Sequence, residues 1–292
     1  MKGKTVKIVR RRRVLPLVLL VGLAFVSVLA TEFFVASIVM NMQKNDNLAE
    51  TEAFLEVPED VLPSINMSFK KVTDSGENID VEVPEKHGTI YLTFDDGPGP
   101  YTNILLDILK HYGVRATFFV TGSGDDAVLL REYEEGHAIG LHTFSHQYSY
   151  IYRNVDNFIN DLVKVQERVK RVTGQTTMLM RFPGGSSNTI STRYDGGKRI
   201  MSRLVDEVEK RGFVYFDWNI VSGDAGETTK TEEVYTNVVN KLGDGEYIVL
   251  QHDVKDFSVA AVEKIIQYGY EHGYDFATLN AESFNAHHGV NN

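Results

Sequence analysis

The body of the chain alternates between two patterns of apolar residues. Short runs rich in β-branched and aromatic residues predict strands over 89–94, 116–120, 138–141, 178–182, 214–216, 247–250 and 276–279. Apolar residues at helical spacing predict helices over 101–112, 127–135, 155–172, 198–211, 232–242 and 259–270. This alternation predicts an α/β fold with a parallel sheet, either doubly wound or closed into a barrel.

Chemically capable side chains stand at the ends of five expected strands. They are Asp95 and Asp96, His142 and His146, Arg181, Asp217 and Trp218, and His252 and Asp253. In barrels of this kind, active sites lie at the carboxyl ends of the strands. The sequence therefore predicts one site assembled from five strands.

Asp95 and Asp96 are adjacent carboxylates at the end of the first strand, and Gly97 and Pro98 stop that strand. Adjacent carboxylates repel each other unless a cation or a proton lies nearby. Taken alone, the pair is better explained as a surface turn, because Asp-Gly is a favoured turn sequence. The histidines and the arginine at neighbouring strand ends favour a cation site instead.

His142 and His146 are four residues apart, so both imidazoles point to one side if the segment turns helically. Taken alone, the pair is equally well explained as solvated or packed histidines. Because the chain contains no cysteine, a metal must be held by His, Asp or Glu. Two histidines and one aspartate suit Zn²⁺ with an open position for water, and also Co²⁺ or other divalent ions. The second aspartate would then be free to take a proton from the water.

Three further residues extend this hypothesis. His252 would serve as a general acid for the leaving group, and the alternative is a packed, hydrogen-bonded histidine. Arg181 would be costly to bury without a carboxylate such as Asp95, and the alternative is a salt bridge at the rim. Trp218, the only tryptophan, would form either an aromatic wall of a cleft or part of the core.

The first 40 residues carry a different pattern. Residues 1–13 contain seven basic residues and no acidic one, and residues 14–31 contain no charged residue. Apolar character resumes after Glu32, and a segment over 14–40 is long enough to span a bilayer. Basic residues before it predict a cytoplasmic N-terminus and an extracytoplasmic body. A cleaved secretory signal ending at Ala30 is the alternative, and it also exports the body.

Charge and composition suggest how the rest of the chain is organised. Because the chain carries −10 and residues 1–13 carry +7, the remainder carries −17, which argues against nucleic-acid binding. Residues 41–87 are predicted to form an extracytoplasmic stalk, with a strand near 79–83. Residues 88–280 are predicted to form the folded domain, and residues 281–292 a loose tail.

Five motifs occur in a familiar order. They are Thr-Phe-Asp-Asp-Gly-Pro at 93–98, His-Thr-x-Ser-His at 142–146, Arg-x-Pro-Gly-Gly at 181–185, Asp-Trp at 217–218 and Leu-x-His at 250–252. With them the chain resembles the polysaccharide deacetylases with a NodB-type domain, carbohydrate esterase family 4. The resemblance implies a distorted (β/α) barrel that hydrolyses an N-acetyl group on a sugar and releases acetate.

The resemblance also implies roles for the matched residues. Six would carry the chemistry: the metal ligands Asp96, His142 and His146, the base Asp95, its orienting partner Arg181 and the acid His252. Four would contact the substrate: Gly184, near which a backbone N–H would hold the oxyanion, Trp218, Leu250 and Asp217.

The chain departs from the family pattern at three positions. Leu141 stands where members often have Asn. Gly184 stands where members often have an aromatic residue, so a wider cleft is expected. Val214 stands where many members have an aspartate that partners the catalytic acid, which leaves Asp217 or Asp224 as substitutes.

Three functions compete on this basis. The first is a membrane-anchored N-acetylglucosamine deacetylase, because an enzyme tethered outside the cell meets peptidoglycan before other polymers. The second is deacetylation of acetylxylan, chitin or exported poly-N-acetylglucosamine. The third is an inactive wall-binding protein, which only Val214 favours, because the residues with implied chemical roles are all present.

Overall fold

The computed structural model describes residues 70–72, 78–80, 85–290 and 292. The predicted cytoplasmic tail, the membrane anchor and most of the stalk lie outside these residues. In the described part of the chain, no helix has the length and apolar character that crossing a membrane requires. Strands β1 (Lys70–Val72) and β2 (Asn78–Asp80) pair antiparallel with each other, and β2 overlaps the strand predicted near 79–83.

The remaining described strands form one parallel sheet. They are β3 (Gly88–Asp95), β4 (Thr117–Val120), β5 (Ala138–Leu141), β6 (Leu179–Met180), β7 (Val214–Tyr215), β8 (Ile220–Val221), β9 (Gly245–His252) and β10 (Tyr274–Phe276). Their order is β7-β6-β5-β4-β3-β9-β8, and β10 pairs with β3. Because β7 and β8 do not pair with each other, the predicted α/β barrel is an open half-barrel.

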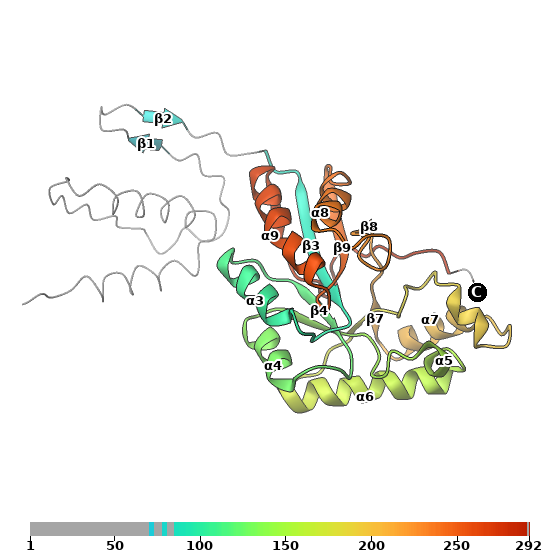
Figure 1. The fold of residues 1–292 in the computed structure, drawn as a ribbon. Helices are drawn as coiled ribbons and strands as arrows, with labels where there is room; N and C mark the ends of the chain where they lie inside the picture. Colours follow the sequence, from blue (N-terminus) through green and yellow to red (C-terminus); the bar gives the residue numbers. More distant parts are fainter. Residues whose placement is uncertain (1–69, 73–77, 81–84, 291) are drawn as a thin grey trace, which may run out of the picture. The chain divides into compact units, whose positions relative to one another are not determined.

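Helices lie outside the strands of this sheet (Figure 1). They are α3 (Thr102–His111), α4 (Asp126–Glu134), α5 (Tyr148–Ile151), α6 (Val155–Thr173), η2 (Ile190–Arg193, a 3₁₀ helix), α7 (Ile200–Lys210), α8 (Thr231–Val239) and α9 (Asp256–Glu271). The six predicted helices are confirmed to within three residues at each end. Local signals explain the ends of the longest, α6, because Asn154 caps its first turn and Gly174 ends it at φ 75°.

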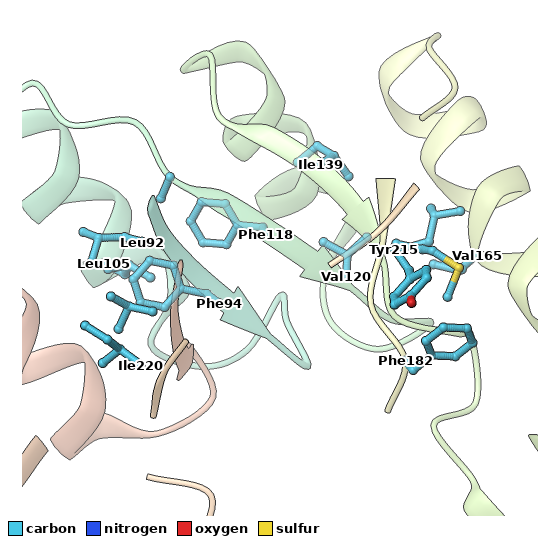
Figure 2. Packing of buried hydrophobic residues seen from close by; sticks show 14 of the residues in the cluster. Leu92, Phe94, Leu105, Phe118, Val120, Ile139, Val165, Phe182, Tyr215 and Ile220 are labelled. Carbon is cyan, nitrogen blue, oxygen red and sulfur yellow. The ribbon is translucent and has the colours of Figure 1, made fainter. Parts of the chain in front are cut away.

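The main core lies between the strands and these helices. Leu105 of α3 packs beside Leu92 and Phe94 of β3, and Phe182 lies beside Tyr215 (Figure 2). The rings of Phe94 and Phe118 stack with centroids 5.4 Å apart. Each fully buried side chain of this size stabilises the fold by roughly 1.5–3 kcal/mol, so the strand ends rest on a rigid base.

Candidate active site

The register of the two longest strands brings the first two site residues together. Strand β3 pairs with β9 so that Asp95 lies directly beside His252. Asp95 is buried, and its Oδ1 accepts a hydrogen bond of 2.8 Å from Nη1 of Arg181. Burial raises the pKa of Asp95, and the positive charge of Arg181 opposes that rise. The carboxylate is therefore held in one orientation with a basicity above its ordinary value.

Arg181 is fully buried, so the alternative of a rim salt bridge does not hold. Its guanidinium donates to the carbonyl oxygens of Phe216 and Asp217, at 3.0 Å each, and to Thr93 Oγ1 at 2.7 Å. A buried charge is tolerated when its donors are satisfied in this way. Arg181 thus holds the Asp95 carboxylate in place through hydrogen bonds to β3 and to the two residues that follow β7.

Asp96, His142 and His146 converge as a group that could hold a metal ion. Oδ1 of Asp96 lies 3.3 Å from Nε2 of His146 and 3.6 Å from Nε2 of His142. One ligand atom from each residue lies within 4.8 Å of the others. Oδ1 of Asp96 is buried and has no hydrogen-bond partner among the described residues. A buried carboxylate oxygen without a donor is costly, so a cation between the three side chains fits this site.

His142 is prepared for such a role by its surroundings. Its Nδ1–H donates to the carbonyl oxygen of Arg181 at 2.9 Å, which leaves the lone pair of Nε2 facing Asp96. Burial, and after it the neighbouring His146, lower the pKa of His142 to about 3. The imidazole is therefore neutral at physiological pH, which is the form that ligates metals.

The segment that carries the two histidines is a loop, so the condition of a helical turn over 142–146 is not met. The imidazole centroids nevertheless lie 5.1 Å apart. Asp96, Thr143 and His146 have left-handed φ angles of 76°, 64° and 50°. Such angles cost non-glycine residues energy. Oδ1 of Asp161 offsets that cost, because it accepts the backbone N–H groups of Phe144 and Ser145 at 2.8 Å each.

His252 has a carboxylate partner, and that partner is Asp224. Nδ1 of His252 lies 2.8 Å from Oδ1 of Asp224, and the backbone N–H of His252 donates to Oδ2 at 2.7 Å. Burial alone would lower the pKa of His252, but the hydrogen bond and charge of Asp224 outweigh it, and the pKa is raised. Of the two substitutes considered for the residue missing at Val214, the geometry selects Asp224.

Comparison with known proteins places this geometry in a family. A family model described as polysaccharide deacetylase matches residues 82–195. A peptidoglycan-N-acetylglucosamine deacetylase of Bacillus cereus is 32% identical over 201 residues, which cover 66% of this chain and 70% of that protein. The chain belongs to the polysaccharide deacetylase family. This confirms the resemblance drawn from the motifs and makes the protein a hydrolase of carbohydrate esterase family 4 that acts on N-acetyl groups.

Two further relatives bear on the fold and the substrate. The crystal structure of the catalytic domain of a peptidoglycan N-acetylglucosamine deacetylase from Eubacterium rectale is 45% identical, with a TM-score of 0.67, and the match covers 75% of this chain and 100% of that one. A peptidoglycan-N-acetylmuramic acid deacetylase of Bacillus subtilis is 30% identical over 195 residues, 65% of this chain and 38% of that protein. The names of these relatives therefore include both peptidoglycan sugars.

In this deacetylase, Asp217 holds a loop and does not contact substrate as predicted. It is fully buried, and its carboxylate accepts the backbone N–H of Ser186 at 2.8 Å and the Ser186 hydroxyl at 2.5 Å. The backbone N–H of His288 also donates to it at 2.8 Å. Both carboxylate oxygens are engaged by the protein, and the side chain has no exposed surface for a ligand.

The glycines of the same loop decide what packs against it. A Cβ on Gly185 would lie 2.9 Å from the ring of Trp218, so glycine allows that ring to approach the backbone. Leu250 is buried on β9 beside Thr93. It lies two residues before His252, on the same face of the strand. The extra space expected from Gly184 is partly occupied, because the Tyr148 hydroxyl lies 3.0 Å from the place of a Cβ there.

The C-terminal residues are packed against the domain, so the loose tail predicted for 281–292 is wrong. The ring of His287 stacks on Tyr215 with centroids 3.9 Å apart, and Asn285 donates to the carbonyl oxygen of Tyr215 at 3.0 Å. Nε2 of His288 lies 2.7 Å from the carbonyl oxygen of Trp218. Hydrophobic periodicity gave no sign of this segment, because polar side chains and backbone groups make its contacts.

Proposed function

We propose that this chain is a metal-dependent deacetylase that removes acetyl groups from N-acetylglucosamine residues of peptidoglycan. The observation that carries the proposal is the pairing of two differently tuned groups, Asp95 with Arg181 and His252 with Asp224, beside the Asp96–His142–His146 group. The peptidoglycan deacetylases among its relatives support the choice of polymer.

Asp96, His142 and His146 would hold the divalent ion, with nitrogen and oxygen donors that suit Zn²⁺ and also Co²⁺. Such an ion, when bound, supplies Lewis-acid polarisation of the acetyl carbonyl and lowers the pKa of water. Asp95 is not a member of this converging group, and its Oδ1 is hydrogen-bonded to Arg181.

Asp95 and His252 then divide the proton transfers between them. Asp95, ionised and oriented by Arg181, accepts a proton from the attacking water as general base. His252, kept protonated by Asp224, donates a proton to the amine nitrogen as the C–N bond breaks. Acetate and the free amino sugar are the products.

The groups around the acetyl moiety come from neighbouring strand ends. The backbone N–H of Gly184 has no acceptor among the described residues, so it is free to donate to the oxyanion. Trp218 and Leu250 would form the apolar wall against which the acetyl methyl group rests.

We also propose that residues 14–40 anchor the enzyme in the cell membrane, with residues 41–87 as a stalk and the catalytic domain outside the cell. The basic cluster at 1–13 and the uncharged run that follows it support this orientation. Protease treatment of protoplasts, which are cells stripped of their wall, should remove the catalytic domain and leave a membrane-bound N-terminal fragment. Release of the whole domain into the medium would instead indicate a cleaved signal.

The purified full chain should release acetate from peptidoglycan when Zn²⁺ or Co²⁺ is supplied, and removal of the metal by a chelator should abolish the activity. Acetylxylan, chito-oligosaccharide and poly-N-acetylglucosamine, tested in parallel, address the alternative polymers. Mass spectrometry of the digested peptidoglycan identifies whether glucosamine or muramic acid lost its acetyl group. Absence of acetate from every polymer with metal bound would leave only the inactive wall-binding protein, which the Asp224–His252 pair disfavours.

The adjacent aspartates should fail in different ways when changed. Asp95→Asn should lower kcat by about 10²–10⁴-fold, the contribution of a general base, and leave metal affinity nearly unchanged. Asp96→Ala should lose the metal, because it removes one of three ligands. Metal content by atomic absorption and acetate release, measured on both variants, separate the two roles. Equal loss of metal in both would refute this division.

A further inference from the structure

Tyr148, the first residue of α5, lies beside the site, and no motif pointed to it. Its ring meets the edge of the His146 imidazole, with centroids 5.4 Å apart, and packs against Tyr152 at 5.5 Å. The side chain is partly buried. These two ring contacts fix the direction of the phenol.

The hydroxyl of Tyr148 points to the loop after β6. It lies 3.0 Å from the place that a Cβ of Gly184 would occupy, and an L-residue there would also be strained, because Gly184 has a φ of 77°. The hydroxyl has no hydrogen-bond partner among the described residues. A hydroxyl that no protein group engages is available to a ligand, both as donor and as acceptor.

Two donors that no described residue engages therefore lie near each other beside the loop after β6. One is the backbone N–H of Gly184, and the other is the phenol O–H of Tyr148, which is protonated at neutral pH. Tyr148 contacts the His146 ring on one side and faces the place of a Gly184 Cβ on the other, so it links the loop of Gly184 to the group formed by Asp96 and the histidines. Paired donors of this kind stabilise the negative charge that forms on a carbonyl oxygen during attack by water.

We propose that Tyr148 is a catalytic residue whose hydroxyl donates a hydrogen bond to the acetyl oxygen of the substrate, as the second donor of an oxyanion hole with Gly184. The glycine at 184 is what leaves room for this hydroxyl. The inference rests on the proposed deacetylase function. No proton is transferred from Tyr148, so the phenol is unchanged at the end of each cycle.

The test is Tyr148→Phe in the full-length enzyme, because phenylalanine keeps both ring contacts and removes only the hydroxyl. Loss of one oxyanion donor lowers kcat by about 100-fold in comparable sites, and KM should change by less than about twofold. Tyr150→Phe, on the same short helix, is the matched control and should keep the kcat of the unchanged enzyme. Acetate release gives both constants, and calorimetric titration with Zn²⁺ gives metal affinity.

Each other outcome overturns the inference in a recognisable way. A raised KM with unchanged kcat would make Tyr148 a ground-state contact to the sugar. Weaker Zn²⁺ binding would make it a support for His146 alone. Unchanged kcat and KM would show that the hydroxyl has no role. An unchanged enzyme that releases no acetate would overturn the proposed function instead. Thermal melts of Tyr148→Phe separate an effect on catalysis from an effect on folding. If phenylalanine lowers the melting temperature, the Tyr148→His variant is measured as well.

Discussion

His252 and Asp224 show how a single contact sets the chemistry of a side chain. The histidine is mostly buried, which favours its neutral form, yet a hydrogen bond to Asp224 and the charge of that carboxylate keep the proton on. The reciprocal effect appears in Asp224, because burial would raise its pKa but the bonds to His252 lower it. The acid of the proposed mechanism therefore depends on a residue 28 positions away in the chain.

Asp224→Asn should move the alkaline limb of the pH–kcat profile to lower pH. The raised pKa of His252 keeps the acid protonated as the pH rises, so activity is lost only above that pKa. Removing the carboxylate lowers this pKa, so the loss of activity begins at a lower pH. Asp206→Asn, an exposed carboxylate on α7, is the control. An alkaline limb that stays in place would show that another group is the acid.

The same pair affects stability with a defined sign. A folded-state pKa above the ordinary value means that protonated His252 stabilises the fold at pH values below the ordinary histidine pKa. This contribution is lost as the pH rises through the folded-state pKa. Asp224→Asn should therefore destabilise the metal-free protein more at pH 5 than at pH 9. These two pH values bracket the ordinary histidine pKa of roughly 6.5.

At the scale of elements, α6 braces two loops of the site with charged residues on its buried face. Asp161 holds the histidine loop through the N–H groups of Phe144 and Ser145. Arg168, seven residues on, donates to the carbonyl oxygens of Thr121 and Ser123 after β4. Asp161 is 1% exposed and Arg168 is 5% exposed. Each charged side chain thus bonds backbone groups of loop residues that belong to no strand or helix.

Asp161→Ala should weaken metal binding without touching a ligand. The variant leaves two backbone N–H groups unpaired and frees a loop with left-handed φ angles at Thr143 and His146. Loss of such supporting residues costs about 10–100-fold in metal affinity. Calorimetric titration with Zn²⁺ measures this, with Glu167→Ala on the exposed face of α6 as control. Unchanged affinity would mean that the loop keeps its shape without Asp161.

The parts of the fold that periodicity predicts are those held by local preference and an apolar face. The six longer helices and strands β3 to β7 and β9 follow this rule, and the strand-end residues then fall on one rim. The two-residue strand β8, the one-turn helix α5 and the position of β10 do not, because they depend on partners far away in the sequence. Asp161 and Arg168 left a signal that was readable, as charged residues at helical spacing within the apolar face of 155–172.

At the scale of the whole described domain, the open side of the half-barrel is where the C-terminal segment attaches. Strand β7 ends the sheet, and the carbonyl oxygen of Tyr215 accepts hydrogen bonds from Asn285 and His287 instead of from a further strand. Edge strands without a partner are a liability, and this segment covers one. Through Asp217 the same segment reaches the loop that carries Gly184.

Deleting residues 285–292 should therefore lower both stability and turnover while leaving the metal site intact. The deletion removes the hydrogen bonds to Tyr215, Asp217 and Trp218, each worth about 1 kcal/mol net, so unfolding free energy should fall by about 3–5 kcal/mol. Freed from His288, Asp217 holds the 183–188 loop less firmly, and kcat should fall by roughly tenfold or more because a misplaced donor stabilises the oxyanion less. Zn²⁺ affinity should stay within about twofold, since Asp96, His142 and His146 lie on other strand ends.

Urea denaturation, acetate release and Zn²⁺ titration of the shortened chain test these three effects together. His272→Ala is the control, because it removes a similar stack on a tyrosine, Tyr268, at the end of α9, away from the carboxyl rim of the sheet. That variant should lose some stability and keep its kcat. If the shortened chain loses stability alone, the segment is only an edge cover, and if it loses Zn²⁺ as well, the metal-binding side chains and the β7 edge are coupled through the sheet. A fall in kcat with Zn²⁺ retained would show that the C-terminal segment supports the oxyanion loop. An ordinary extra strand that only covered the sheet edge would not have this effect.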